Sequence, residues 1–275
     1  MKPQTCPAIV SVAIRAQDGQ LELPVLPAVA SEVLAFVDSE DADARALAAL
    51  VQRDPSMAAH VLRVANSARY APTEPIVSLT QAIGRLGLST LREIAVSVAA
   101  RVAVFKVAGH EALVEGLWTH AQATATVARE IARARGANLD AAFLSGLLHD
   151  IGAPIVLQGL ADVREQEGLT TTEAGVQEAI DTLHAYVGAE LVRRWELPAW
   201  VAQSVLHHHA PEEAEEAEDV VRTVALADAL AHWLAGSDGK GVPPGLEHAE
   251  ALELRAQDIE QVCVGVAAQL SNPED

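Results

Sequence analysis

Apolar residues recur every three or four positions along almost the whole chain after residue 24. Val29, Val33 and Val37 form one such stripe, and Leu79, Ile83 and Leu86 begin another. This spacing places apolar side chains on one face of a helix, whereas a half-buried strand would show strict alternation, which we do not see. The pattern therefore predicts an all-α protein.

Capping residues predict where several helices begin. Asp54 followed by Pro55 matches an N-cap with proline at the first helical position. Thr90 and Glu93 have the spacing of a capping box for a helix that starts at Leu91.

Later boundaries follow from glycine and proline. Gly136 is expected to end a helix and Asp140 to cap the next one, which carries Phe143. A longer loop with Gly159 and Gly168 should follow. Further helices are predicted at about 173–195, 199–209, 219–235 and 247–270, with a loop at 236–245.

Composition and charge narrow the class of protein. Half of the residues are hydrophobic (50%) but only 3% are aromatic, and the dominant Ala and Leu favour helices. A net charge of −19 disfavours binding to nucleic acid or to an anionic membrane, since both need clustered Lys and Arg. Much of this charge lies in solvated segments such as 212–219.

Cysteine usage and hydropathy predict a soluble cytoplasmic protein. Cys6 and Cys263 are far apart and show neither zinc-ligand spacing nor a disulfide framework. The N-terminus makes a poor signal peptide. The longest apolar tract, Ile94 to Gly109, is interrupted by Arg101 and Lys106 and is too short to span a bilayer.

Several polar residues lie on the apolar faces of predicted helices. His120, His184, His208 and Asp228 all have apolar neighbours at helical spacing. A single histidine in such a place is more often a hydrogen-bonded core residue than a ligand. A buried carboxylate is costly unless it is paired, and the Asp228 carboxylate could also pair with a neighbouring histidine or arginine.

The adjacent pair His149–Asp150 adds a second indication. Asp150 lies near the C-terminal end of its predicted helix, where the helix dipole disfavours an anion, so a metal ion or a protonated histidine should compensate it. Imidazole and carboxylate groups that converge between helices are suitable ligands for Mn, Fe, Zn or Ni. The candidate metal ligands are His120, His149, Asp150, His184, His208, His209 and Asp228.

The order His, His-Asp, His, His-His, Asp resembles the HD superfamily. The wider sequence is similar to the HDOD domain, the HD-related output domain of bacterial signalling proteins. The segments that carry this resemblance are "LPVLPAVASEVL", "RDPSMAAHVLRVANSARY", "SLTQAIGRLGLSTLRE", "LWTHAQATATVAREIA", "FLSGLLHDIG", "HAYVGAELVRRWELPAWV" and "LHHHAPE".

The resemblance implies an N-terminal helical lobe (20–108) packed on an HD-type helical lobe (109–235), which together form an HDOD domain over 20–235. Residues 236–275 would add a loop and a C-terminal helix. HDOD domains are generally regulatory or protein-interaction modules, and many have lost the HD ligands, which this chain keeps.

The sequence also departs from the related HD-GYP cyclic-di-GMP phosphodiesterases. Ala153 stands where those enzymes usually carry a phosphate-binding lysine, and Gly116 stands where some carry a glutamate. The acidic stretch "APEEAEEAED" replaces their Gly-Tyr-Pro loop and would repel a phosphate. These positions favour signalling over catalysis.

We therefore expect a signal-transduction protein that binds a partner protein, that contacts neither nucleic acid nor membrane, and that could form oligomers. The alternative is a metal-dependent phosphohydrolase for a nucleotide or cyclic dinucleotide, with His149, Asp150, His120 and Asp228 around the metal. Nucleic-acid binding would need the few arginines to gather on one face.

Two groups in the chain have both a structural and a functional interpretation. Asn66, Arg69 and Tyr70 could form a partner surface, or Asn66 and Ser67 could end a helix while Tyr70 packs on the other lobe. The tryptophans are expected in the core or between lobes rather than in a ligand cage; they are Trp118, Trp195, Trp200 and Trp233.

Overall fold

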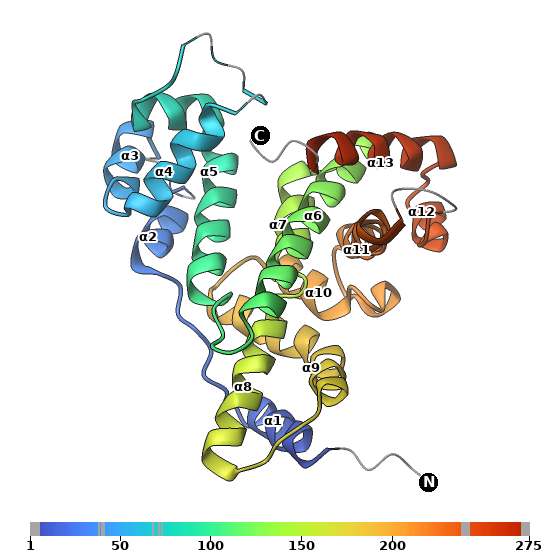
Figure 1. The fold of residues 1–275 in the computed structure, drawn as a ribbon. Coiled ribbons are helices and arrows are strands. Elements are labelled where there is room, and N and C mark those ends of the chain that lie inside the picture. The colour runs from blue at the N-terminus through green and yellow to red at the C-terminus, as the bar shows by residue number, and fades with distance from the viewer. Residues whose placement is uncertain are drawn as a thin grey trace.

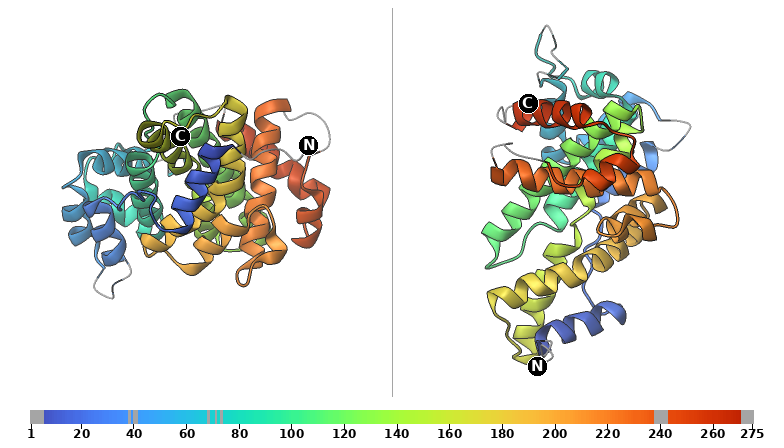
Figure 2. Two further views of the ribbon diagram at one scale, coloured as in Figure 1. Left: turned by 90° about the horizontal axis from the view of Figure 1, so that it is seen from below. Right: turned by 90° about the vertical axis from the view of Figure 1, so that its right-hand side faces the viewer.

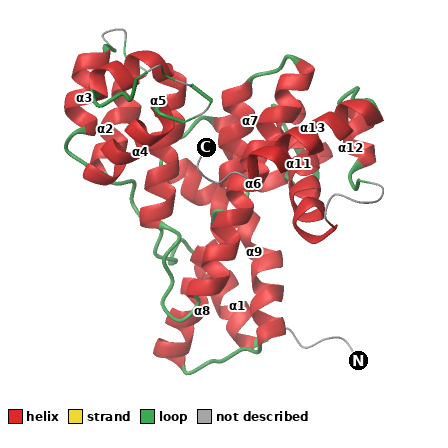
Figure 3. Ribbon diagram, turned by 45° about the horizontal axis from the view of Figure 1, so that its top comes forward, coloured by secondary structure: helices red, strands yellow, loops and turns green. Residues whose placement is uncertain are grey.

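The computed structural model describes residues 6–37, 39, 42–67, 69–70, 72, 74–237 and 243–270, with backbone alone for 268–270. Every regular element in these residues is a helix, and Figure 3 shows them arranged as two helical lobes. The predicted all-α class and the two-lobe arrangement are therefore confirmed.

The N-terminal lobe contains four helices, which lie together in Figure 1. Its buried core combines side chains from every one of them, among them Val33, Leu47, Val61 and Ile83. The helices are α2 (Ala28–Val37), α3 (Ala44–Val51), α4 (Pro55–Ala65) and α5 (Leu79–Ala103).

The HD-type lobe is built on the long helix α6, against which α7, α11 and α13 pack, while α8 and α10 pack on α9 (Figure 1). A one-turn 3₁₀ helix, η1 (Pro211–Glu213), precedes α11. The other bounds are α6 (Glu111–Arg135), α7 (Leu139–Leu148), α8 (Gly152–Glu167), α9 (Glu173–Arg194), α10 (Ala199–His207), α11 (Glu218–Ser237), α12 (Leu246–Ala251) and α13 (Ala256–Leu270).

Helix α5 belongs to both lobes. Ile94 and Ala95 are buried in the core of the N-terminal lobe, whereas Val96 and Ala100 are buried in the core of the HD-type lobe. A helix that is apolar on two faces must be covered on both, so α5 fixes one lobe against the other.

An N-terminal helix that the sequence pattern did not predict, α1 (Pro7–Gln17), packs on α8 and α9 of the HD-type lobe. Both views in Figure 2 place it there, away from the helices that follow it in sequence. Arg15 pairs with Glu167 at 2.6 Å. The connection to α2 is held where the indole nitrogen of Trp195 donates to the carbonyl of Pro24 at 2.9 Å.

Some predicted boundaries are confirmed and others are wrong. Asp54 caps α4 and Gly136 ends α6 in a left-handed conformation, as expected. Asn138, not Asp140, caps α7, because the Asn138 side chain accepts from the backbone amides of residues 140 and 141. A separate helical segment does begin shortly before Leu91, after the non-helical Gly87 of α5, but Thr90 lies inside this segment and does not cap it.

Two further expectations about helices are corrected. Gly159 lies inside α8 rather than in a loop, although Gly168 ends that helix as a left-handed C-cap. The expected single helix over about 247–270 is two helices, α12 and α13, separated after Ala251. Positions 238–242 of the predicted loop at 236–245 lie outside the described residues, and 236–237 belong to the end of α11.

One described stretch, Leu139–Glu167, is long and apolar enough to cross a membrane. It comprises α7 and α8 with a turn between them, and 78% of its most apolar window is buried inside the protein. Burial of this extent is typical of core helices. The predicted cytoplasmic location and the exact domain limits stay predictions.

Candidate metal centre

Five helices bring all seven predicted ligands to one place in the HD-type lobe. His120 projects from α6, His184 from α9 and Asp228 from α11. The pairs 149–150 and 208–209 directly follow the last residues of α7 and α10. The side chains of the cluster are buried or mostly buried, apart from the exposed His209.

Three of the histidines are oriented in the same way by the backbone. The Nδ1 atom of His149 donates to the carbonyl of Gly146 at 2.8 Å, and that of His184 donates to Ile180 at 2.7 Å. His208 Nδ1 lies 2.9 Å from the Val205 carbonyl. Since each Nδ1 carries the proton in such a bond, each Nε2 is left to face the cluster as a potential ligand.

The Nε2 atoms and one carboxylate converge closely. His184 Nε2 lies 3.3 Å from His208 Nε2 and 3.1 Å from His209 Nε2. Asp150 is shared: its Oδ1 lies 3.3 Å from His184 Nε2 and its Oδ2 lies 3.3 Å from His149 Nε2. Asp150 therefore stands between two groups of histidines.

The second group surrounds Asp228. Its Oδ1 lies 2.9 Å from His120 Nε2 and 3.7 Å from His149 Nε2. His232, one helical turn further along α11, lies 3.5 Å from the same oxygen and stacks on His120 with ring centroids 4.0 Å apart. His232 was not predicted; its i,i+4 spacing from Asp228 could have revealed it.

Two glycines allow the backbones around this centre to approach one another. A Cβ at Gly146 would lie 2.9 Å from the Cα of Ala125, so this glycine lets α7 pack directly on α6. A Cβ at Gly152 would lie 2.0 Å from the carbonyl oxygen of His184. Gly152 therefore lets the start of α8 lie against α9 beside a candidate ligand.

The electrostatics of the cluster favour positive charge at its centre. Burial opposes the charged form of Asp150, but His149 beside it holds the pKa of that carboxyl well below its usual range. Burial likewise works against protonation of His149, yet Asp150 and Asp228 together raise its pKa well above the usual value. Without a metal ion, a proton on His149 compensates the two carboxylates.

Other histidines of the cluster are held neutral and thus able to act as ligands. Burial lowers the pKa of His184. Burial, with the neighbouring His208 and His184, lowers the pKa of His209 to about 4. A metal ligand must be deprotonated, so these shifts suit coordination near neutral pH.

The residues fit a divalent transition metal. The Nε2 atom of His149 is buried and has no hydrogen-bond partner, which is costly for a polar atom unless something else binds it. Ligand nitrogens about 2.1 Å from one ion are about 3.0 to 3.4 Å apart, and the His184, His208 and His209 separations of 3.1 and 3.3 Å agree with this. Imidazole and carboxylate donors suit Mn, Fe, Zn or Ni.

The positions that depart from the phosphodiesterase pattern lie as follows. Ala153 is fully buried in the core. Gly116 lies on α6 with open space around it. The acidic stretch after the histidine pair forms η1 and the first turn of α11, and Glu213 lies 4.0 Å from His207. Glu213 thus lies beside the residue that precedes the histidine pair, while Glu218 pairs with Arg222 at 2.6 Å.

In the N-terminal lobe, Asn66 has a clear structural role. It ends α4, and its side chain bonds in both directions with the backbone of Ile76, at 2.8 and 2.7 Å. Tyr70 packs on the core of its own lobe and bonds with Thr90, so its predicted contact with the other lobe is wrong. Arg69 is exposed.

The tryptophans are distributed as the sequence suggests. Trp118 and Trp195 are buried in the core of the HD-type lobe, and Trp200 packs against it. Trp233 packs against a second core formed by α6, α11, α12 and α13.

A family comparison agrees with this architecture. The model of the HDOD domain family matches residues 23–211. The chain belongs to the HDOD family, and the resemblance inferred from its sequence is confirmed.

Solved structures share the fold over nearly the whole chain. A protein from Shewanella amazonensis SB2B, named provisionally as a metal-dependent phosphohydrolase, is 20% identical, covers 94% of this chain and 96% of its own, and has a TM-score of 0.75. An HDOD domain protein of unknown function from Geobacter sulfurreducens is 24% identical with a TM-score of 0.68, over 96% and 95% of the two chains. At these identities the likeness concerns the fold.

Curated relatives are longer than this chain. An uncharacterized protein of Treponema pallidum is 28% identical over 251 residues, which are 86% of this chain and 46% of that relative. Ribonuclease Y of Thermus thermophilus is 34% identical over 133 residues, 48% of this chain and 19% of the enzyme. The chain thus spans less than half the length of either relative.

Proposed function

We propose that this chain is a regulatory HDOD protein that transmits a signal by binding a partner protein, with a divalent transition metal held in its HD-type lobe. Membership of the HDOD family supports the regulatory role. The observation that carries the choice of regulation over catalysis is Ala153, which is fully buried where the related phosphodiesterases usually carry a phosphate-binding lysine. Glu212 and Glu213 also follow the histidine pair within four residues, and their charge opposes a phosphate nearby.

The metal itself is supported by the cluster rather than by the family. A metal ion could take the place of the proton on His149, because it would bind the unpartnered Nε2 and compensate the two carboxylates beside it. In this proposal the metal joins α6, α7, α9, α10 and α11, and so makes the lobe rigid enough to present a fixed partner surface.

A second candidate function is favoured by the completeness of the ligand set. This is a metal-dependent phosphohydrolase that acts on a nucleotide or cyclic dinucleotide. A divalent ion bound at the centre would supply Lewis acidity and lower the pKa of a bound water. In this alternative, the Nε2 atoms of His120 and His149 would each carry a proton or a lone pair. The carboxylates of Asp150 and Asp228 beside them would orient the two imidazole rings.

Elemental analysis tests the metal centre independently of the chain's membership of the HDOD family. Wild-type protein expressed with Mn, Fe, Zn and Ni available should retain one of them in stoichiometric amount. The double variant His149→Ala, Asp150→Ala should lose it. A wild type that stays free of metal under these conditions would contradict the metal centre and with it the phosphohydrolase.

Turnover then separates regulator from enzyme. Metal-loaded protein is incubated with cyclic-di-GMP, bis-p-nitrophenyl phosphate and a short RNA, the last because Ribonuclease Y is among the relatives. The regulatory proposal expects no hydrolysis above that of the double variant. Hydrolysis by the wild type that the double variant lacks would assign the chain as an enzyme instead.

Partner binding needs its own measurement. Proteins captured by the wild type are purified and tested one by one for direct binding by calorimetry. The double variant serves as the control for the role of the metal. If no purified candidate binds the wild type directly, the partner-binding part of the proposal fails.

A further inference from the structure

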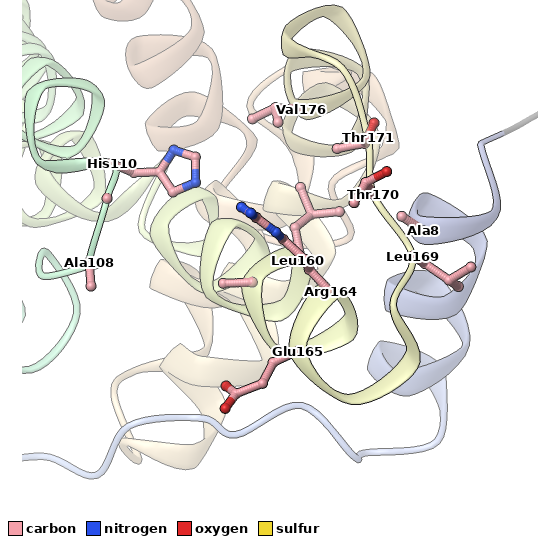
Figure 4. A pocket seen from close by; sticks show the side chains of 12 residues that line it. Ala8, Ala108, His110, Leu160, Arg164, Glu165, Leu169, Thr170, Thr171 and Val176 are labelled. Atoms are coloured by element: carbon pink, nitrogen blue, oxygen red, sulfur yellow. The ribbon is translucent and has the colours of Figure 1, made fainter.

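A cavity of about 630 Å³ lies at the end of the HD-type lobe that carries α1. It opens between α8, the start of α9, the first turn of α1 and the segment 108–110 (Figure 4). Its size falls within the range of small-molecule sites, about 300 to 1,000 Å³. None of the candidate metal ligands lines it, so it is a separate feature.

Two basic side chains face this cavity from different segments. Figure 4 shows the guanidinium of Arg164 and the imidazole of His110 directed toward one another, while the carboxylate of Glu165 points away from both. The ion pairs and hydrogen bonds of the described residues include none made by the Arg164 side chain.

A helix end adds to this arrangement. Thr170 and Thr171 line the cavity immediately before α9, and Figure 4 shows their hydroxyl oxygens on the side away from Arg164 and His110. The side chain of the next residue, Thr172, caps the helix by accepting from the amide of Gly175 at 3.1 Å. The positive end of the dipole of this 22-residue helix thus lies beside the cavity. An arginine and a helix N-terminus both favour an oxyanion.

The remaining walls are apolar. Ala8, Leu160, Leu169 and Val176 contribute methyl and methylene surface to the cavity. An inorganic anion alone would leave this surface in contact with water, whereas a ligand with an apolar body would cover it.

We propose that this cavity binds a small molecule that combines one oxyanion group with an apolar body. The oxyanion lies between Arg164 and His110, and the apolar body contacts Leu160 and Val176. Because Ala8 of α1 lines the cavity, a bound molecule also contacts this N-terminal helix. The site is suited to an input ligand of the regulatory protein, and in that sense it extends the proposed function.

Isothermal titration calorimetry with phenyl phosphate tests the site, with benzyl alcohol and inorganic phosphate as partial ligands. Phenyl phosphate should bind saturably and more tightly than either partial ligand. Arg164→Gln keeps the aliphatic stem and removes the charge of an exposed residue, so the fold should persist. It should weaken binding by about tenfold or more, the effect of losing a charge-assisted contact.

Arg194→Gln is the matched control. Arg194 is an exposed arginine at the far end of α9, and the variant should bind phenyl phosphate like the wild type. Equal binding by Arg164→Gln and the wild type would overturn the proposal, and so would the absence of saturable binding by the wild type.

The metal centre could itself attract a phosphate, so the variant His149→Ala, Asp150→Ala is titrated in parallel. Binding at the cavity should survive in this variant and disappear in Arg164→Gln. Loss of binding in the double variant with full retention in Arg164→Gln would place the anion at the metal centre and refute the cavity site. If the cavity does not bind phenyl phosphate, the proposed function is not affected. If the metal centre or the regulatory role is wrong, the cavity proposal is likewise not affected.

Discussion

The carboxylate of Glu93 on α5 pairs with the guanidinium of Arg129 on α6, and this ion pair joins the two lobes. Both side chains are nearly buried, with exposed fractions of 9% and 11%. Arg129 also lies over the ring of Phe143, 3.8 Å from its centroid. Burial is the largest effect on Glu93 and outweighs the arginine, so the pKa of this carboxyl is raised to about 7.

The raised pKa predicts a pH dependence of stability. Glu93 holds its proton in the folded state at pH values where the unfolded chain has released it, so this group favours folding at low pH. We expect the free energy of unfolding of the wild type to fall, relative to Glu93→Gln, as the pH rises from about 4.5 to about 7. The full difference is about 3 kcal/mol.

Urea unfolding of both proteins between pH 4.5 and 8 measures this difference. The comparison cancels the other titrating groups, because the two chains differ at one residue. Parallel curves for the two proteins would show that Glu93 has an ordinary pKa.

Gly152 should tolerate no larger side chain. A Cβ there meets the backbone of α9 at His184 and Gly188, with contacts of 2.0 and 2.5 Å, so α8 and α9 must separate. We expect Gly152→Ala to cost about 1–3 kcal/mol or more of stability and to reduce metal content. Thermal unfolding and elemental analysis report the two effects.

Gly116→Ala is the control for that substitution. This glycine lies inside α6 with open space around it, one turn before His120. Alanine should stabilise the protein by about 0.5–1 kcal/mol, because it lowers the entropy of the unfolded chain and favours the helix. If both variants behaved alike, the close approach of α8 and α9 would not be the cause.

The paired bonds between Asn66 and Ile76 predict a structural cost in the N-terminal lobe. Asn66→Ala should lower the free energy of unfolding by about 1–3 kcal/mol, because it leaves the amide and carbonyl of Ile76 without their partner. Chemical denaturation measures this loss. Arg69→Ala, at an exposed position nearby, should stay within about 0.5 kcal/mol of the wild type.

The difference in expected stability between Asn66→Ala and Arg69→Ala also decides which variant can test partner binding through this lobe. Arg69→Ala should leave the fold intact, so a loss of partner affinity in it would report on the surface. The same loss in Asn66→Ala would be ambiguous.

The two carboxylate oxygens of Asp150 predict two metal positions. One group comprises His184, His208 and His209, and the other includes His120 and His149. We expect two ions per chain in fully loaded protein, and about one in His209→Ala. Elemental analysis at rising metal concentration gives both values. A stoichiometry unchanged in His209→Ala would mean that this histidine is not a ligand.

Thermal unfolding provides an independent measure of the same centre. A metal that binds the folded chain alone stabilises it by mass action, so a chelator should lower the melting temperature of the wild type. His149→Ala should show a smaller shift than the wild type, because it keeps the position formed by His184, His208 and His209. A shift of equal size in both proteins would place the metal elsewhere.

Most of the helices could be predicted because their apolar stripes are local in sequence. The failures have tertiary causes. Gly159 looked like a loop residue, but it lies in α8 where the side chains of Leu21 and Val12 approach within 3.1 and 3.3 Å of an added Cβ. Thr90 looked like a cap, but its hydroxyl bonds with Tyr70.

The residues of the candidate site could be predicted more accurately than the helix boundaries. Each of the seven side chains lies where helical spacing or an adjacent pair had placed it, and the fold brings them together. Their role as ligands stays a prediction. His232 escaped notice because its side chain is 69% exposed, so no apolar stripe included it.

The docking of α1 sets a condition on how the chain acquires its structure. Ser11 and Arg15 find their partner, Glu167, more than 150 positions later, and the anchor for Pro24 is Trp195. Helix α1 therefore lacks the surface on which it packs until α8 and α9 have been synthesised. Contacts of such long range slow folding. We expect α1 to be the last element to become protected from hydrogen exchange during refolding.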